Sequence, residues 1–170
     1  MSVFGDSGVG KTSLINRFMT NKFDLDVGKT MGVNISTKNV VIENLRVVLQ
    51  IWDFLGEERF RSIIKTYASG TFGGIFMYDI TSKNSLMNLN EWIALFHNTF
   101  PSTKKKIPII LVGGKSDLNN EREITKEDAL SILRLHNMFT FIECSSKTGE
   151  NIEEVFFSLT NKIMKINGYI

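Results

Sequence analysis

The sequence is poor in cysteine and proline and has no long hydrophobic run. Its single cysteine, Cys144, has no partner for an intramolecular disulfide, which favours a reducing compartment. No apolar run reaches the length of a membrane span, and no signal-peptide pattern is present. The net charge of +2 gives no argument for nucleic-acid binding, and we interpret the one basic run, residues 104–106, as a solvated loop.

The remaining composition is that of an ordinary globular protein. With 170 residues, 42% hydrophobic and 22% charged, the chain can bury a core, and we expect one domain over residues 1–170. Because four residues precede Gly5, we expect a short first strand, as if the N-terminus were trimmed. Residues 168–170 offer no cysteine for prenylation, so a lipid anchor would need a tail absent from this sequence.

The most informative segment is 5–12, Gly-Asp-Ser-Gly-Val-Gly-Lys-Thr, which fits the phosphate-loop pattern. Its glycines let backbone N–H groups face inward, Lys11 can reach outer phosphates, and the Thr12 hydroxyl can hold Mg²⁺. The helix beginning near Lys11 adds its positive dipole end. A nucleoside polyphosphate is therefore predicted, the alternative being a glycine-rich turn without ligand. The expected lining residues are Asp6, Ser7, Gly8, Val9, Gly10, Lys11, Thr12 and Ser13.

Strands and helices alternate after this loop. Two β-rich runs, 33–42 and 45–52, are separated by Glu43-Asn44, which predicts a hairpin. The predicted fold is α/β: three layers with a mostly parallel six-stranded sheet, one antiparallel strand and about five helices, and ligands at the C-terminal strand ends. The other predicted strands are 73–78, 107–112 and 140–144, and the other helices cover 86–96, 129–133 and 152–166, the last two beginning near Thr125 and Asn151.

Asp53 is predicted to follow the second hairpin strand directly. Beside a phosphate loop, a carboxylate there can bind Mg²⁺ directly or through water. Gly56 could then offer its backbone N–H to a terminal phosphate, so that the loop senses whether that phosphate is present. An Asp at a strand end is otherwise often a turn or cap residue, but the phosphate loop upstream favours the metal role.

Two further loops follow predicted strands. Asp117, after strand 107–112, offers a bidentate acceptor suited to the adjacent N–H and NH₂ donors of guanine, a pair that adenine lacks. The stem of Lys115 can lie on the base, and the backbone N–H of Ser146 can meet the guanine carbonyl oxygen. Taken alone, residues 145–147 would be an ordinary serine-rich turn.

Together these residues resemble the Ras superfamily of small GTPases, most closely its Rab branch. The resemblance covers nearly all of residues 3–166 and implies a P-loop NTPase G domain. The matching segments are Gly-Asp-Ser-Gly-Val-Gly-Lys-Thr at 5–12, Thr-Met-Gly-Val at 30–33, Leu-Gln-Ile-Trp-Asp at 49–53, Glu-Arg-Phe at 58–60, Tyr-Asp-Ile-Thr at 78–81, Gly-Lys-Ser-Asp at 114–117 and Ser-Ser-Lys at 145–147.

The resemblance implies roles for individual residues. Thr30 would join Mg²⁺ and the γ-phosphate in switch I, about 24–34, and residues 54–67 would form switch II. Phe23 would pack edgewise on guanine. The implied catalytic residues are Glu57, Lys11, Gly56 and Thr30. The further nucleotide contacts are Gly114, Lys115, Asp117, Leu118, Ser145, Ser146 and Lys147. The apolar partner-binding cluster is Ile35, Trp52 and Tyr67. Trp52 could instead be a core residue.

Some positions depart from the family pattern. Glu57 stands where a glutamine usually orients the attacking water, and a carboxylate cannot donate a hydrogen bond unless protonated, so slow hydrolysis is expected. The alternative is that Glu57 acts as a base or points to solvent, with Glu58 or a partner's arginine finger completing the site. Gly114 replaces an asparagine that would bond guanine N7 and tie this loop to the phosphate loop, so Gly114→Asn is expected to tighten GDP binding. Phe54 and Leu55 are bulkier than usual, and Val27 replaces an aromatic covering the phosphates.

Three functions remain open at this level. The favoured one is a GTP/GDP switch with Mg²⁺ and slow hydrolysis; the others are a module locked with GTP or GDP, and a different P-loop enzyme such as an ATPase or kinase, which Asp117 disfavours. The resemblance implies effector, exchange-factor and GTPase-activating partners at the switches, and a role in vesicle traffic. We expect a monomer that binds no nucleic acid and is cytoplasmic, or peripheral at membranes if a tail supplies an anchor.

Overall fold

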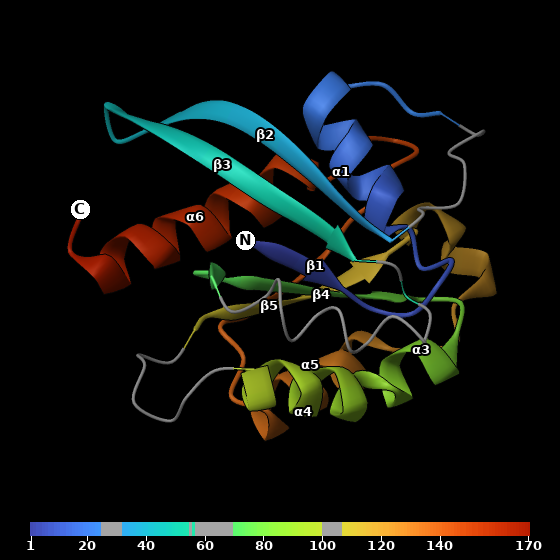
Figure 1. Ribbon diagram of the computed structural model, residues 1–170. Helices are drawn as coiled ribbons and strands as arrows, with labels where there is room; N and C mark the ends of the chain where they lie inside the picture. Colours follow the sequence, from blue (N-terminus) through green and yellow to red (C-terminus); the bar gives the residue numbers. More distant parts are fainter. Residues whose placement is uncertain (25–31, 55, 57–69, 100–106) are drawn as a thin grey trace.

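A mixed six-stranded sheet forms the centre of the molecule (Figure 1). The computed structural model describes residues 1–24, 32–54, 56, 70–99 and 107–170. The strand order is β2-β3-β1-β4-β5-β6; β2 and β3 are antiparallel and every other neighbouring pair is parallel, as predicted. The strands are β1 (Ser2–Phe4), β2 (Val33–Ile42), β3 (Leu45–Phe54), β4 (Gly74–Asp79), β5 (Ile109–Gly114) and β6 (Thr140–Glu143).

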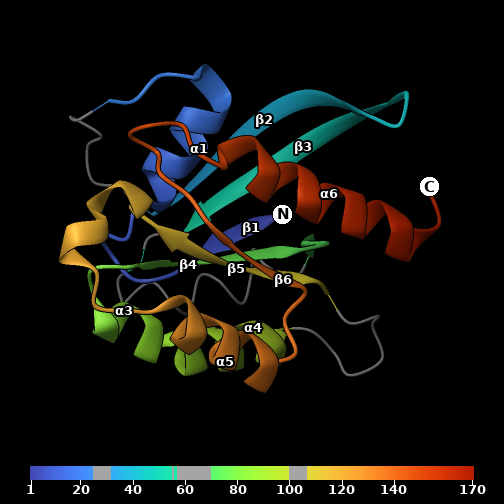
Figure 2. The ribbon, with the colours of Figure 1, turned by 180° about the vertical axis from the view of Figure 1, so that it is seen from behind.

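Helices cover both faces of the sheet and complete the three predicted layers. In Figures 1 and 2, α1 and α6 lie on one face and α3, α4 and α5 on the other. Two buried apolar clusters match these faces: one contains Phe18 and Phe156, the other Trp92 and Ala129. The helices are α1 (Lys11–Thr20), α3 (Lys83–Met87), α4 (Leu89–Thr99), α5 (Lys126–Leu135) and α6 (Ile152–Asn167), with a 3₁₀ helix, η3, over Ser116–Glu121.

The β2–β3 hairpin is confirmed and is longer than predicted. Its turn residues Glu43 and Asn44 have φ of 46° and 68°, the left-handed values of a two-residue type I′ turn. The pairing continues through Asn34↔Asp53 and Val33↔Phe54. Asp53 therefore lies within β3 rather than after it, because β2 supplies partners for two more residues than the alternation indicated.

Helix boundaries agree with the sequence in part. Thr125 forms a full capping box with Asp128 at the start of α5, as its position predicted. The single helix predicted over 86–96 is instead α3 and α4, with Asn88 between them. Asn151 precedes α6 without capping it by its side chain, since its Nδ2 donates to the Glu143 carbonyl at 2.8 Å.

Cys144 lies directly after β6 and is fully buried. Burial, with smaller contributions from Glu150 and Glu143, raises the pKa of its thiol to about 12. Because the thiolate is the reactive form, this cysteine behaves as the inert core residue expected from the sequence. Within the described ranges, no helix has the length and apolarity needed to cross a membrane.

Candidate functional site

The predicted site residues converge on one edge of the sheet. The phosphate loop follows β1, Asp53 lies near the end of β3, Lys115 follows β5, and Ser145 comes two residues after β6. Because these strands are parallel, their C-terminal ends meet at the same edge (Figure 1). Segments far apart in the sequence therefore form one site.

The phosphate loop needs glycine at both of its ends. A Cβ on Gly5 would overlap the carbonyl oxygen of Met77 in β4, so the loop can leave β1 only without a side chain there. Gly10 has φ of 105° and precedes α1 without any side-chain cap. The N-terminus of α1 thus carries no side-chain cap at Gly10, which suits the anion that the phosphate-loop pattern predicts.

Lys11 brings a buried positive charge to the same place. Its side chain is 6% exposed, and Nζ donates to the Asp6 carbonyl at 2.6 Å. Burial lowers the pKa of Lys11 to about 8, although Asp53 and Asp6 act in the opposite direction. A buried ammonium beside an uncapped helix N-terminus is stabilised by an anion, so these residues fit a polyphosphate.

Two of the three predicted metal ligands are in direct contact. The Thr12 hydroxyl donates to Asp53 Oδ2 at 2.6 Å, and Asp53 is 3% exposed. A hydroxyl and a carboxylate side by side next to a phosphate site suit Mg²⁺, which takes few protein ligands and completes its shell with water and phosphate oxygens. The third, Thr30, lies outside the described residues.

Asp6 connects the phosphate loop to the helices below the sheet. Its two carboxylate oxygens accept from Asn88 Nδ2 at 2.7 Å and from Trp92 Nε1 at 2.8 Å. The phosphate-loop pattern predicts Asp6 among the nucleotide contacts, but its side chain is directed to the junction of α3 and α4. A phosphate contact from this residue would have to come from its main chain.

The loops after β5 and β6 are joined through Asp117. Ser145 Oγ donates to Asp117 Oδ1 at 2.6 Å, and Lys147 Nζ lies 3.8 Å from Oδ2. Lys115 Nζ forms an ion pair with Asp79 Oδ2 at 2.5 Å. The predicted base-recognition residues therefore lie together, and the Asp117 carboxylate is oriented by the neighbouring loop.

Comparison with known proteins agrees with this geometry. The family model described as "Ras family" matches residues 1–165. The chain belongs to the Ras family. It is 40% identical to the Ras-related protein Rab-18 of Lymnaea stagnalis over 166 residues, covering 98% of this chain and 80% of that protein. It is 37% identical to the GTP-binding protein ypt3 of Schizosaccharomyces pombe, covering 96% and 75% respectively. The chain is thus a Rab-like small GTPase of the Ras superfamily.

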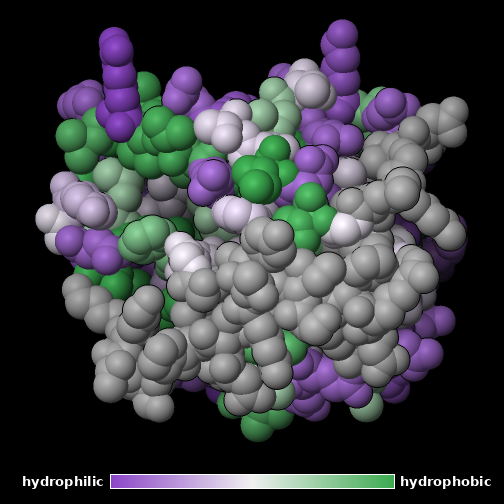
Figure 3. All heavy atoms as spheres, viewed as in Figure 1, coloured by the Kyte–Doolittle hydropathy of each residue, from purple (hydrophilic) through white to green (hydrophobic). Residues whose placement is uncertain are grey.

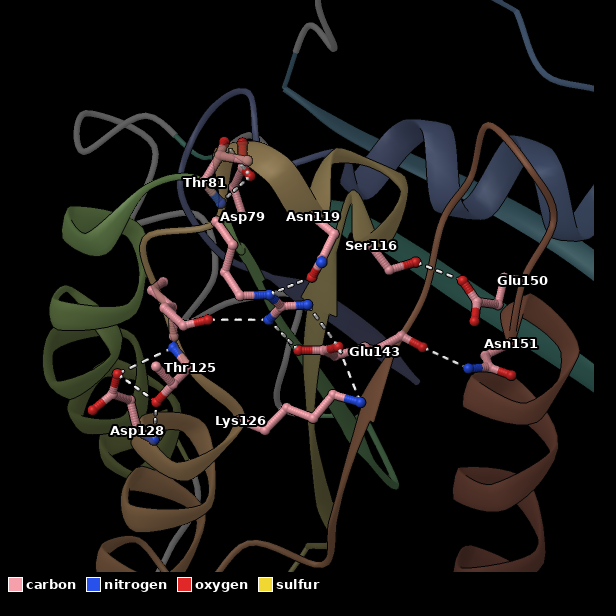
Figure 4. A network of polar contacts seen from close by, with 12 residues as sticks. Asp79, Thr81, Ser116, Asn119, Thr125, Lys126, Asp128, Glu143, Glu150 and Asn151 are labelled. Atoms are coloured by element: carbon pink, nitrogen blue, oxygen red, sulfur yellow. Dashed lines mark hydrogen bonds and ion pairs between the residues drawn. The ribbon is translucent and has the colours of Figure 1, made fainter.

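Further polar residues join the loops predicted to recognise the base in this Rab-like protein (Figure 4). Arg122, after η3, donates from Nη1 and Nη2 to the Glu143 carboxylate in β6 at 2.6 and 3.0 Å, and from Nε to Asn119 Oδ1 at 2.9 Å. The bond to Glu143 raises the pKa of Arg122. Ser116 Oγ donates to Glu150 at 2.8 Å. Sequence reasoning missed Arg122 and Glu143 because nothing local indicates that they pair.

The switch regions of the Rab-like fold are described only in part. Val27, Thr30, Leu55, Glu57 and Tyr67 lie outside the described residues, as does the 104–106 run. Gly56 is described, and a Cβ there would overlap the main chain of Asp6 and Ser7, so this residue touches the phosphate loop.

Two residues of the predicted partner surface are neighbours on the sheet. Ile35 and Trp52 pair directly across β2 and β3, and Ile35 is 46% exposed. Trp52 packs on the core, which agrees with the core role considered for it, and it also lines a groove of about 540 Å³ beside β3. Figure 3 shows further apolar side chains at the surface of the hairpin, where Val41 and Val48 are well exposed.

Proposed function

We propose that this Rab-like protein is a guanine-nucleotide switch that binds GTP or GDP with Mg²⁺ and hydrolyses GTP slowly, as a single G domain over residues 1–170. The observation that carries the proposal is that two sets of polar and charged residues converge at one sheet edge. Buried Lys11 lies beside the Thr12–Asp53 pair, and Asp117 is held by Ser145. The first set suits a Mg²⁺-bound polyphosphate and the second a guanine base.

The proposed phosphate and metal site follows from the first set. The α1 N-terminus and Lys11 hold the phosphates, while Thr12 and Asp53, joined by Thr30, hold Mg²⁺. When bound, Mg²⁺ supplies positive charge that neutralises the outer phosphates. Gly56 packs on the phosphate loop, and we propose that its N–H donates to a terminal phosphate when one is present.

The proposed base site follows from the second set. Asp117 accepts from the guanine N–H and NH₂, and the Ser145 hydroxyl keeps the carboxylate in place. Lys115 is anchored at its amine by Asp79, which leaves its aliphatic stem as the part that can lie against the base. Phe23, Leu118, Ser146 and Lys147 complete the proposed pocket.

The Rab-like surface is proposed to serve partner proteins. Effectors, exchange factors and GTPase-activating proteins would contact the switches and the cluster of Ile35, Trp52 and Tyr67, since a partly exposed tryptophan is a favoured interface anchor. Similarity to Rab proteins supports a role in vesicle traffic, at membranes to which a lipid-anchored tail or a partner recruits the protein.

Substituting Glu57 by Gln is expected to speed single-turnover GTP hydrolysis roughly tenfold or more, because an amide can orient the attacking water without adding negative charge near the γ-phosphate. The measurement is phosphate release from preloaded protein after Mg²⁺ addition. Glu121→Gln removes a charge from an exposed position on η3 and serves as the control. An unchanged rate in the Glu57→Gln protein would assign the slow step to another residue.

The first test of the function is to denature the purified protein, identify the released nucleotide, and follow one turnover of GTP with Mg²⁺. Guanine nucleotide with measurable phosphate release supports the switch. Guanine nucleotide without release favours the locked module or an absolute need for an activating partner, which an added arginine-bearing activator would distinguish. A preference for ATP would overturn the role of Asp117.

A further inference from the structure

Gly114 is kept as glycine by its surroundings rather than by its backbone. It ends β5 and opens the base-recognition loop, and it is not among the residues with positive φ. Its φ therefore does not require glycine. What opposes a side chain is space: a Cβ at this position would lie closer than 3.0 Å to the ε-methyl of Met77, which would have to move, and 3.1 Å from the Val9 carbonyl oxygen in the main chain.

Met77 reaches this place from the neighbouring strand. It lies in β4, between β1 and β5, and is 1% exposed. A Cβ on Gly10, in the phosphate loop, would also lie 3.3 Å from the Met77 ε-methyl. The same methyl group thus fills the space between Gly10 and Gly114, one glycine from each of the two nucleotide-binding loops.

The geometry points to Met77 as a positioning residue for the nucleotide: its ε-methyl packs between Gly10 and Gly114 and sets the spacing of the phosphate loop and the base-recognition loop. This inference rests on the proposed function. A flexible thioether suits such an irregular gap. Met77 thereby supplies, by apolar packing, the connection between the two loops that an asparagine at 114 would make by hydrogen bonds.

This arrangement changes the outcome expected for Gly114→Asn. The sequence alone predicted that the amide would tighten GDP binding. With Met77 in place, the new side chain must displace a buried methyl group, so the substitution alone is expected to speed GDP release. Gly114→Asn is expected to tighten GDP binding only in a protein in which Met77 has been replaced by a smaller residue.

The test is a double-mutant cycle of Met77→Val and Gly114→Ala, with GDP dissociation as the readout. Alone, Gly114→Ala is expected to speed GDP release roughly tenfold, and Met77→Val by about threefold because the loops lose their shared contact. In the Met77→Val background, Gly114→Ala should change the rate by less than about twofold. Gly114→Asn in that background is expected to slow release relative to Met77→Val alone.

The adjacent Gly113 gives a matched control. A Cβ there would lie 2.9 Å from the Tyr78 hydroxyl and 3.2 Å from Glu143 Cγ, away from Met77, so Met77→Val should not rescue Gly113→Ala. Unfolding temperatures of the nucleotide-free proteins measure separately how far each substitution destabilises the packing of the fold. The inference would be overturned if Met77→Val and Gly114→Ala changed the rate of GDP release independently of each other. It would also be overturned if the two substitutions were coupled in unfolding temperature but not in GDP release. A wild-type protein that retains no guanine nucleotide would instead overturn the proposed function.

Discussion

Substituting Asp117 by Asn is expected to weaken GDP binding roughly 100-fold or more, because two charge-assisted hydrogen bonds are lost, at about 1.5–3 kcal/mol each. The structure also predicts which way the new amide turns. Ser145 Oγ donates to Asp117 Oδ1 at 2.6 Å, so the amide oxygen should keep that bond and the NH₂ should face the base. It would then oppose the donors of guanine and pair with the additional carbonyl of xanthine.

Xanthosine diphosphate should therefore bind the Asp117→Asn protein better than GDP does, reversing the order in the wild type. Competition of both nucleotides against a fluorescent GDP analogue measures this order. Glu121→Gln, in the same 3₁₀ helix, removes a charge without touching the proposed base site. Equal losses for both diphosphates would mean that Asp117 supports the loop without reading the base.

Substituting Lys11 by Gln is expected to lower GDP and GTP affinity by roughly 100-fold or more, since a buried charged contact to phosphate is removed. The same change should leave the nucleotide-free protein at least as stable. Burial lowers the pKa of Lys11 from 10.5 to about 8, which means that keeping the charge costs the fold on the order of 3 kcal/mol at neutral pH. Lys11→Gln is thus expected to lower nucleotide affinity while leaving the nucleotide-free protein equally or more stable.

The pH dependence gives an independent check on Lys11. Between pH of about 8 and 10.5 the unfolded chain holds a proton on Lys11 that the nucleotide-free fold has released, so the contribution of Lys11 to the unfolding free energy should rise with pH in this range. The raised pKa values of Cys144 and Tyr78 contribute a fall from pH of about 9 upward, and this fall is common to both proteins. The unfolding free energy of the wild type minus that of Lys11→Gln should therefore show the rise that belongs to Lys11. Denaturant unfolding in EDTA, with exposed Lys22→Gln as the control, measures it. A loss of stability in Lys11→Gln at neutral pH would contradict the buried-charge account.

The features predicted well from the sequence are those that depend on residues close together in the chain. The phosphate loop depends on the spacing of Gly10 and Lys11, the hairpin on Glu43-Asn44, and the start of α5 on Thr125 with Asp128. Each involves residues within a few positions of one another. Local chemistry was therefore enough to position the three elements, with errors only at their ends.

The features that sequence missed depend on contacts between distant segments. The Arg122–Glu143 pair, the Lys115–Asp79 pair and the Met77–Gly114 contact each join different strands or loops. A single sequence does not indicate which acidic residue an arginine will meet, nor which methionine will fill the space beside a glycine. The outcome expected for Gly114→Asn differs between sequence and structure for this reason. The sequence shows that an asparagine is missing at 114, but it does not show that Met77 occupies the space beside this position.

The bond between Trp92 and Asp6 also has an optical consequence. The chain has two tryptophans, Trp52 beside the switches and Trp92 with its indole N–H on the phosphate-loop carboxylate. Indole emission depends on charges and hydrogen bonds near the ring. A Trp52→Phe protein would therefore carry one native fluorophore attached to the loop that holds the phosphates, and nucleotide exchange could be followed in real time without a synthetic label.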